Sequence, residues 1–146
     1  MSGMGAVVVV AALAVTAVAA WWLRTRDGAV HSTGAEEDGV AASAFDRLGV
    51  RPGEADLTVV QFSTAFCGPC RATKARLRQL QATRPGLAVV QVDAESHLDE
   101  VRALDVRRTP TLFYLGRDGE LIGRSSGAPR PDELTALVDA HTGAGS

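Results

Sequence analysis

The chain has 146 residues, of which 46% are hydrophobic and 22% are charged, and its formal net charge is -2. A chain of this length accommodates one domain and an appendage. The near-neutral charge argues against a nucleic-acid-binding protein, which needs a strongly basic surface, and two cysteines are too few for a disulfide-rich secreted scaffold.

The chain begins with an apolar segment, residues 4–23, "MGAVVVVAALAVTAVAAWWL", which contains no charged residue. About 20 helical residues span the roughly 30 Å hydrocarbon core of a bilayer. Trp21 and Trp22 fall where interfacial aromatic residues are expected. We therefore expect one transmembrane helix that binds the lipid bilayer, after a short tail at residues 1–3. A cleaved signal peptide and a buried core helix are alternatives, but the tail lacks the positive charge of a signal peptide.

The segment after the anchor indicates how the chain is oriented and where the domain begins. Arg24 and Arg26 follow the apolar segment, and no basic side chain precedes it. The positive-inside rule therefore favours a single-pass cell-membrane protein with a cytoplasmic domain, with an extracytoplasmic domain as the alternative. Residues 24–42 are rich in Gly, Ser, Thr and acidic residues, which is typical of a flexible linker. Residues 43–142 have the size of one small domain, and residues 143–146 form a tail.

The sequence of this domain predicts alternating helices and strands. The helices are expected at 42–48, 70–83, 97–104 and 131–141. The strands are expected at "LTVVQFS" (57–63), "LAVVQVD" (87–93), "TLFYL" (111–115) and 120–124. Alternation with helices implies parallel strands, whereas the tight turn between the last two strands implies an antiparallel hairpin. We therefore expect an α/β fold with a mixed central sheet flanked by helices.

Both cysteines lie in "CGPC", residues 67–70, between a buried strand and the helix that follows. Residues three apart in the first turn of a helix have Cα atoms about 5–6 Å apart, within disulfide range. Cys67, at the helix start, lies near unpaired N–H groups and the positive end of the dipole, which lower a thiol pKa from about 8.5 toward about 7. Cys70, one turn later, should be more buried. A nucleophile and a resolving thiol require this asymmetry.

Two other uses of the cysteine pair fit the sequence less well. A zinc site needs about four ligands, and the three histidines of the chain are scattered without ligand spacing. A purely structural disulfide across so short a loop restricts the unfolded chain very little. We therefore expect neither a metal nor a bound cofactor.

With "CGPC" placed after a buried strand, residues 43–142 resemble thioredoxin. The motif has the composition of the reducing members of that family. Thr109 and Pro110, directly before "TLFYL", resemble the cis-proline loop of the family. Gly119 fills the hairpin turn, and Gly127 falls where the family has a glycine beside the active site. The resemblance implies a thioredoxin-like fold and thiol–disulfide exchange.

The resemblance also implies a role for each matched residue. Cys67 would attack a disulfide of a target protein, and Cys70 would resolve the mixed disulfide. Pro110 would be cis and lie opposite the sulfurs. Thr109 would offer backbone groups to an extended target segment, with Gly127 nearby.

Three positions depart from the pattern of the family. Phe66 replaces the tryptophan that usually precedes the first cysteine, so an aromatic side chain for substrate contact is kept without the indole N–H. Gln61 replaces a buried aspartate that reducing members often have, and Val89 replaces the lysine that often pairs with it. Glutamine cannot take a proton from Cys70, so we expect its deprotonation to rely on water or on the departing thiolate.

Together these patterns predict a monomeric, membrane-tethered protein-disulfide reductase that acts in cell redox homeostasis. Its partners would be disulfide-containing proteins and an electron donor. The donor implied by the resemblance is a flavin-containing, NADPH-linked thioredoxin reductase for a cytoplasmic domain, or a membrane thiol carrier for an exported one. The alternative is a non-catalytic binding module that uses the thioredoxin fold as a scaffold.

Overall fold

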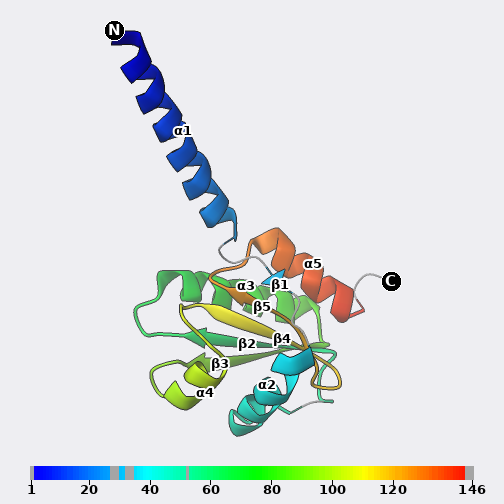
Figure 1. Cartoon of the computed structure of the whole chain (residues 1–146). Helices are drawn as coiled ribbons and strands as arrows, with labels where there is room; N and C mark the ends of the chain where they lie inside the picture. The colour runs from blue at the N-terminus through cyan, green and yellow to red at the C-terminus, as the bar shows by residue number, and fades with distance from the viewer. Residues whose placement is uncertain (1, 27–29, 32–34, 52, 144–146) are drawn as a thin grey trace.

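The computed structural model describes residues 2–26, 30–31, 35–51 and 53–143. Parts of the predicted linker and of both tails lie outside this description. The helices are α1 (Ser2–Arg26), α2 (Ala35–Arg47), α3 (Gly68–Thr83), α4 (Leu98–Ala103) and α5 (Pro131–His141). The strands are β1 (Val30–His31), β2 (Leu57–Ser63), β3 (Leu87–Asp93), β4 (Thr111–Gly116) and β5 (Leu121–Ser126) (Figure 1). From α2 onward, this is the predicted order of elements.

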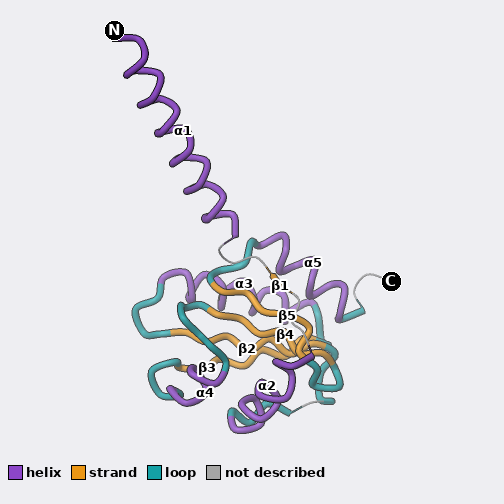
Figure 2. The backbone as a smooth tube through the Cα atoms, in the orientation of Figure 1, coloured by secondary structure: helices purple, strands orange, loops and turns teal. Residues whose placement is uncertain are grey.

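The described strands form one sheet in the order β1-β5-β4-β2-β3. β2 and β3 are parallel, because α3 crosses over between them, and β4 is antiparallel to both β2 and β5. α3 and α5 cover one face of the sheet, and α2 and α4 cover the other (Figures 1 and 2). The predicted mixed sheet between two layers of helices is therefore confirmed.

The alternation of side chains along the strands builds one hydrophobic cluster on each face. In β2, Val60 and Phe62 point toward α2 and α4. Phe113 of β4 lies edge-on to Phe62 and to Phe45 of α2, with ring centroids 5.8 Å and 5.3 Å away. The Arg124 guanidinium lies 4.9 Å from the centroid of the Phe113 ring. Phe113 of β4 thus packs against α2 and β2 and lies under the Arg124 cation of β5.

The segment predicted to be a flexible linker, residues 24–42, contains regular structure where it is described. β1 pairs antiparallel with β5, with Val30 opposite Ser125 and His31 opposite Arg124. A strand of two residues is too short to produce a hydrophobic pattern, so only the structure reveals it.

Helix α2 begins at Ala35, earlier than the residue 42 expected from the sequence. It begins with the sequence "AEED", whose composition is typical of a linker. The helix buries Phe45 against the sheet. The Arg47 guanidinium donates to Glu100 Oε1 of α4 at 2.8 Å, and this hydrogen bond holds the pKa of Glu100 below its usual value. α2 is therefore part of the folded domain.

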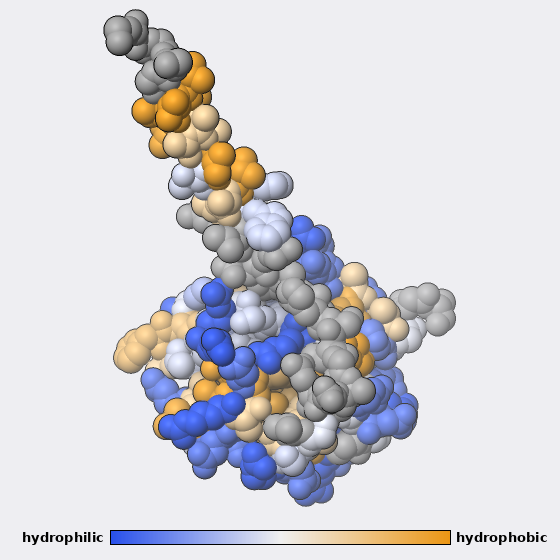
Figure 3. Space-filling model, in the orientation of Figure 1, coloured by the Kyte–Doolittle hydropathy of each residue, from blue (hydrophilic) through white to orange (hydrophobic). Residues whose placement is uncertain are grey.

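Helix α1 extends away from the domain (Figures 1 and 3). Its described large apolar side chains are exposed, with Val15 at 69% and Trp21 at 67%. Across the described residues, none of the helices is both long enough and apolar enough to cross a membrane. The expected transmembrane anchor at residues 4–23 is therefore not confirmed.

Replacing Phe113 by alanine should lower the free energy of unfolding by about 3–5 kcal/mol, because the change opens a cavity between the rings of Phe45 and Phe62 and the Arg124 guanidinium. Phe66→Ala is the matched control, because the side chain of Phe66 is 99% exposed. Denaturant titration followed by circular dichroism measures both. Equal effects of the two substitutions would contradict the assigned core.

Candidate active site

Cys67 and Cys70 form a disulfide, with Cα atoms 5.2 Å apart. α3 begins at Gly68, so Cys67 is its N-cap residue, as predicted, and Pro69 occupies the first turn, where a missing N–H costs nothing. The Cys70 amide N–H donates to Cys67 Sγ at 3.1 Å. Cys67 Sγ therefore lies at the open end of the helix, where N–H groups and the dipole stabilise a thiolate once the disulfide is reduced.

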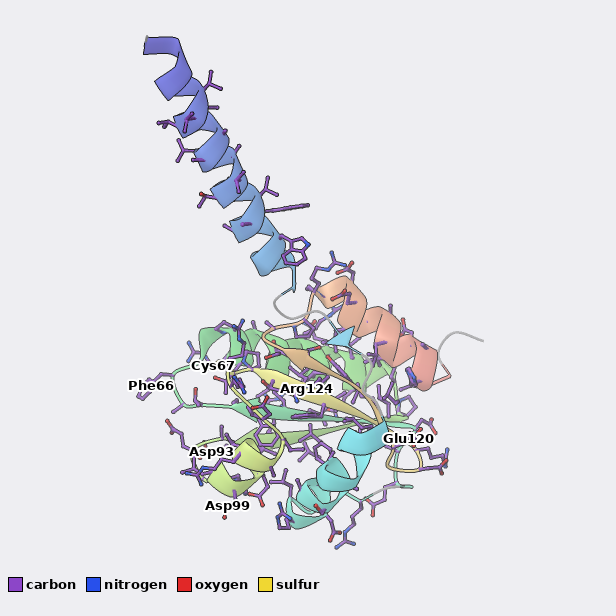
Figure 4. The ribbon with its side chains drawn as sticks, in the orientation of Figure 1. Phe66, Cys67, Asp93, Asp99, Glu120 and Arg124 are labelled. Atoms are coloured by element: carbon purple, nitrogen blue, oxygen red, sulfur yellow. A yellow bond between two sulfur atoms is a disulfide. The ribbon has the colours of Figure 1, made fainter. Side chains whose placement is uncertain are left out.

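The two cysteines are both nearly buried in this oxidised state, with exposed fractions of 8% for Cys67 and 4% for Cys70. The difference has the predicted direction but is small. Phe66, in contrast, projects into solvent beside Cys67 at the end of the sheet (Figure 4). An exposed aromatic ring next to a reactive sulfur offers apolar contact to a partner molecule.

The loop at Thr109 and Pro110 lies at the same end of the sheet. Their peptide bond is cis, as the resemblance implied. The Gly127 amide donates to the Pro110 carbonyl at 2.8 Å, and the hydroxyl oxygens of Thr109 and Thr64 lie 3.4 Å apart. Gly127 has a φ of 100°, which favours glycine because side chains crowd that conformation. The structure thus joins Thr109, Pro110 and Gly127 and adds Thr64, which the sequence did not single out.

Strand register explains why these loops meet. Phe62 of β2 pairs with Thr111 of β4, and Thr111 pairs with Ser126 of β5. The residues just beyond these three therefore lie at one edge of the sheet. That edge also carries the start of α3, because α3 follows β2 directly.

Gln61 is a fully buried polar side chain beneath the second cysteine. Its Nε2 donates to the Cys70 carbonyl at 3.0 Å, and its Oε1 accepts from Gln91 Nε2 at 3.1 Å. The resemblance placed Val89, on the next strand, at the position of the usual partner of residue 61. In the structure the partner is Gln91, which pairs with Gln61 in register. The repeated "VVQ" in both strands was the available signal.

Asp93 ends β3 at the same edge of the sheet, opposite Ser63. Its carboxylate accepts hydrogen bonds from the Ser96 hydroxyl at 2.6 Å and from the Glu95 amide at 3.1 Å. The Ser96 bond, followed by the Glu95 bond, holds the pKa of Asp93 below its usual value. Among the described residues, no group of His, Cys, Asp and Glu side chains is arranged to hold a metal ion.

The model of the family described as "Thioredoxin" matches residues 40–140 of this chain. The matched region contains every side chain of the candidate site.

Curated relatives and solved structures agree with that match. The chain is 31% identical to Thioredoxin H4-1 of Oryza sativa subsp. japonica over 87 residues, which are 58% of this chain and 66% of the relative. It is 29% identical to Thioredoxin H9 of Arabidopsis thaliana over 98 residues, 65% of this chain and 69% of the relative. The chain thus spans about two thirds of the length of these relatives.

Among solved structures, the chain is similar to mitochondrial thioredoxin 3 from Saccharomyces cerevisiae in its oxidized form. The TM-score is 0.55 at 28% sequence identity, covering 67% of this chain and 88% of the yeast protein. Thioredoxin from Fasciola hepatica gives a TM-score of 0.56 at 27% identity, covering 69% of this chain and 93% of that protein.

Proposed function

The chain belongs to the thioredoxin family, and on that premise we propose that it is a thiol–disulfide oxidoreductase that reduces disulfide bonds in proteins. One observation carries the proposal. Cys67 is the N-cap residue of α3 and forms a disulfide with Cys70 one turn later. Its sulfur also accepts a hydrogen bond from the Cys70 amide N–H. This arrangement suits a sulfur that alternates between thiolate and disulfide.

The reaction proceeds through two exchanges. In the reduced chain the Cys67 thiolate attacks one sulfur of a target disulfide, so that the target S–S bond breaks and a mixed disulfide forms. The departing target thiolate takes a proton. Cys70 then loses its proton and attacks the Cys67 sulfur, which releases the second target thiolate. This second thiolate also takes a proton. The target has thus gained two electrons from the dithiol and two protons, one released by Cys70 and one from solvent, and the chain ends in the disulfide form described here.

The residues around Cys67 would hold the target. Phe66 offers an exposed aromatic ring, and the loop of Thr109 and Pro110 lies at the same edge of the sheet. Backbone groups of Thr109 and Gly127 can pair with an extended segment that carries the target disulfide. Reduction of the chain itself requires an electron donor, and we propose a thioredoxin reductase for a cytoplasmic domain or a membrane thiol carrier for an exported one.

We further propose that residues 4–23 tether the domain to a membrane, with the domain on the cytoplasmic side. The uncharged sequence of this segment supports the tether, and so do the exposed apolar side chains along α1. Arg24 and Arg26, after the segment, support the orientation.

The full chain should accelerate the reduction of insulin by dithiothreitol, measured as the turbidity of the released insulin chains. Cys67→Ser should abolish turnover, because the nucleophile is lost. Cys70→Ser should accumulate a covalent complex with the target, visible on a non-reducing gel. Wild-type protein without any turnover would instead favour a non-catalytic binding module.

Gln61→Asp should speed the release of reduced target from the mixed disulfide, because a carboxylate beneath Cys70 can accept its proton where the amide cannot. We expect roughly a hundredfold acceleration, the lower end of the range for general base catalysis. Gln61→Asn is the matched control, with the same shape and no titratable group. Rapid quenching measures the lifetime of the mixed disulfide, and equal lifetimes in the two variants would refute the proton-transfer argument.

The full chain should remain in the membrane fraction after an alkaline carbonate wash, whereas deletion of residues 2–26 should release it. A reporter fused after Ser146 should be active only in the cytoplasm. A chain that washes off the membrane would end the tether proposal and leave the exchange reaction untouched.

A further inference from the structure

Positive charge is concentrated around the helix that carries the cysteines. Residues 57–92 contain no acidic residue, although the whole chain has a net charge of -2. The basic residues of this stretch are Arg71, Lys74, Arg76, Arg78 and Arg84. The segment that builds the candidate site therefore differs in charge from the rest of the chain.

Three of these cations lie along one flank of α3. Arg71, Lys74 and Arg78 follow the spacing i, i+3, i+7, which places them in a row along a helix. We call this row the cationic stripe. The buried face of the helix consists of Cys70, Thr73, Leu77 and Leu80. Arg71 and Arg78 are exposed and Lys74 is half-buried.

Arg76 does not belong to the stripe. Its side chain lies on the other flank of α3, where Nη2 donates to the Thr135 hydroxyl of α5 at 2.8 Å. That bond helps to join α3 to α5. The stripe, on the opposite flank, has no comparable partner among the residues that the structure describes.

The stripe is unpaired within the described part of the chain. None of its three side chains forms an ion pair or a side-chain hydrogen bond with a described residue. Most other described arginines of the domain do pair with carboxylates: Arg47 with Glu100, Arg84 with Asp139, Arg102 with Asp99, Arg107 with Asp105, Arg117 with Asp56, and Arg130 with Asp132 and Glu133. The cations near the sulfur are thus left available to a partner.

We propose that the cationic stripe binds an acidic segment of the protein whose disulfide Cys67 attacks. This inference rests on the proposed exchange function and adds a substrate class to it. The stripe begins with Arg71, one helical turn after Cys67, so a polypeptide that contacts the sulfur can also reach the stripe. Unpaired cations beside a reactive group raise the encounter rate of anionic partners and disfavour cationic ones.

Helix geometry sets the spacing that such a segment needs. Lys74 lies seven residues after Cys67, about 10 Å along the helix, and Arg78 lies eleven residues after it, about 16 Å. An extended peptide covers about 3.3 Å per residue. Carboxylates about three and five residues from the attacked cysteine therefore fit the stripe.

A protein segment explains the position of the stripe better than a lipid surface does. Anionic headgroups bound at Arg71 would lie next to Cys67 and hinder the approach of a target disulfide. An acidic polypeptide brings the disulfide and the carboxylates in one molecule. Binding to lipid is therefore treated as an outcome of the test.

The test compares three cyclic disulfide peptides that differ only at the third and fifth residues from each cysteine, which are glutamate, glutamine or lysine. The full chain in neutral detergent should reduce the glutamate peptide about 3- to 10-fold faster than the glutamine peptide in about 0.01 M salt, and the lysine peptide more slowly. The differences should vanish near 1 M salt, where the screening length is roughly 3 Å.

Lys74→Ser/Arg78→Ser should remove most of this preference and leave the rate with the glutamine peptide unchanged. Arg102→Ser/Arg117→Ser is the matched control, because it removes the same charge from exposed ion pairs on α4 and in the β4–β5 turn. Equal rates for the glutamate and glutamine peptides would overturn the inference, as would equal losses in both double variants. Failure to reduce any peptide would instead overturn the exchange function.

Lys74 also allows a direct test of contact, because it is the only lysine of the chain. The Cys70→Ser variant should trap the glutamate peptide on Cys67, and carbodiimide should then join Lys74 to a peptide carboxylate. Mass spectrometry locates the cross-link. A trapped peptide without this cross-link would contradict the proposal. The proposal would also be contradicted if Lys74→Ser/Arg78→Ser weakened binding only to vesicles of phosphatidylglycerol and phosphatidylcholine, because the stripe would then be a lipid site.

Discussion

The register of β4 between β2 and β5 is the constraint on which the candidate site depends. It aligns Phe62, Thr111 and Ser126 across three neighbouring strands, so that the loops beyond them meet at one edge of the sheet. A slip of one residue would turn Phe113 out of its aromatic cluster and carry Pro110 away from Gly127. The packing of the core and the assembly of the site therefore have the same cause.

A pair of amides, the buried Gln61 and the exposed Gln91, connects this sheet to the reactive helix. Gln61 and Gln91 sit opposite each other on parallel strands, and Gln61 donates to the carbonyl of Cys70. Burial makes an unsatisfied amide costly, so both hydrogen bonds matter for holding the first turn of α3 in place. Cys70 is thereby fixed to the sheet, while Cys67 lies at the outer end of the helix beside the exposed Phe66.

Much of this arrangement could be predicted because local sequence determines it. The strands are β-branched and apolar, the helices show a regular spacing of apolar residues, and "CGPC" follows a strand directly. The first part of helix α2, residues 35–41, escaped prediction because its composition is that of a linker and because the helix packs through Phe45 against a distant sheet. The Gln91 partner of Gln61 and the contact between Gly127 and Pro110 depend on strand register, which no single segment encodes.

The pairing of β1 with β5 limits how far the domain can move from helix α1. While Val30 stays opposite Ser125, only four Cα–Cα steps of about 3.8 Å separate Arg26 from Val30, or roughly 15 Å of chain. If α1 is fixed in place, the cysteine sulfurs can therefore move only a short distance from it. If β1 separated from β5, the connecting segment would extend from Arg26 to the start of α2 at Ala35. The domain could then reach a larger volume around α1.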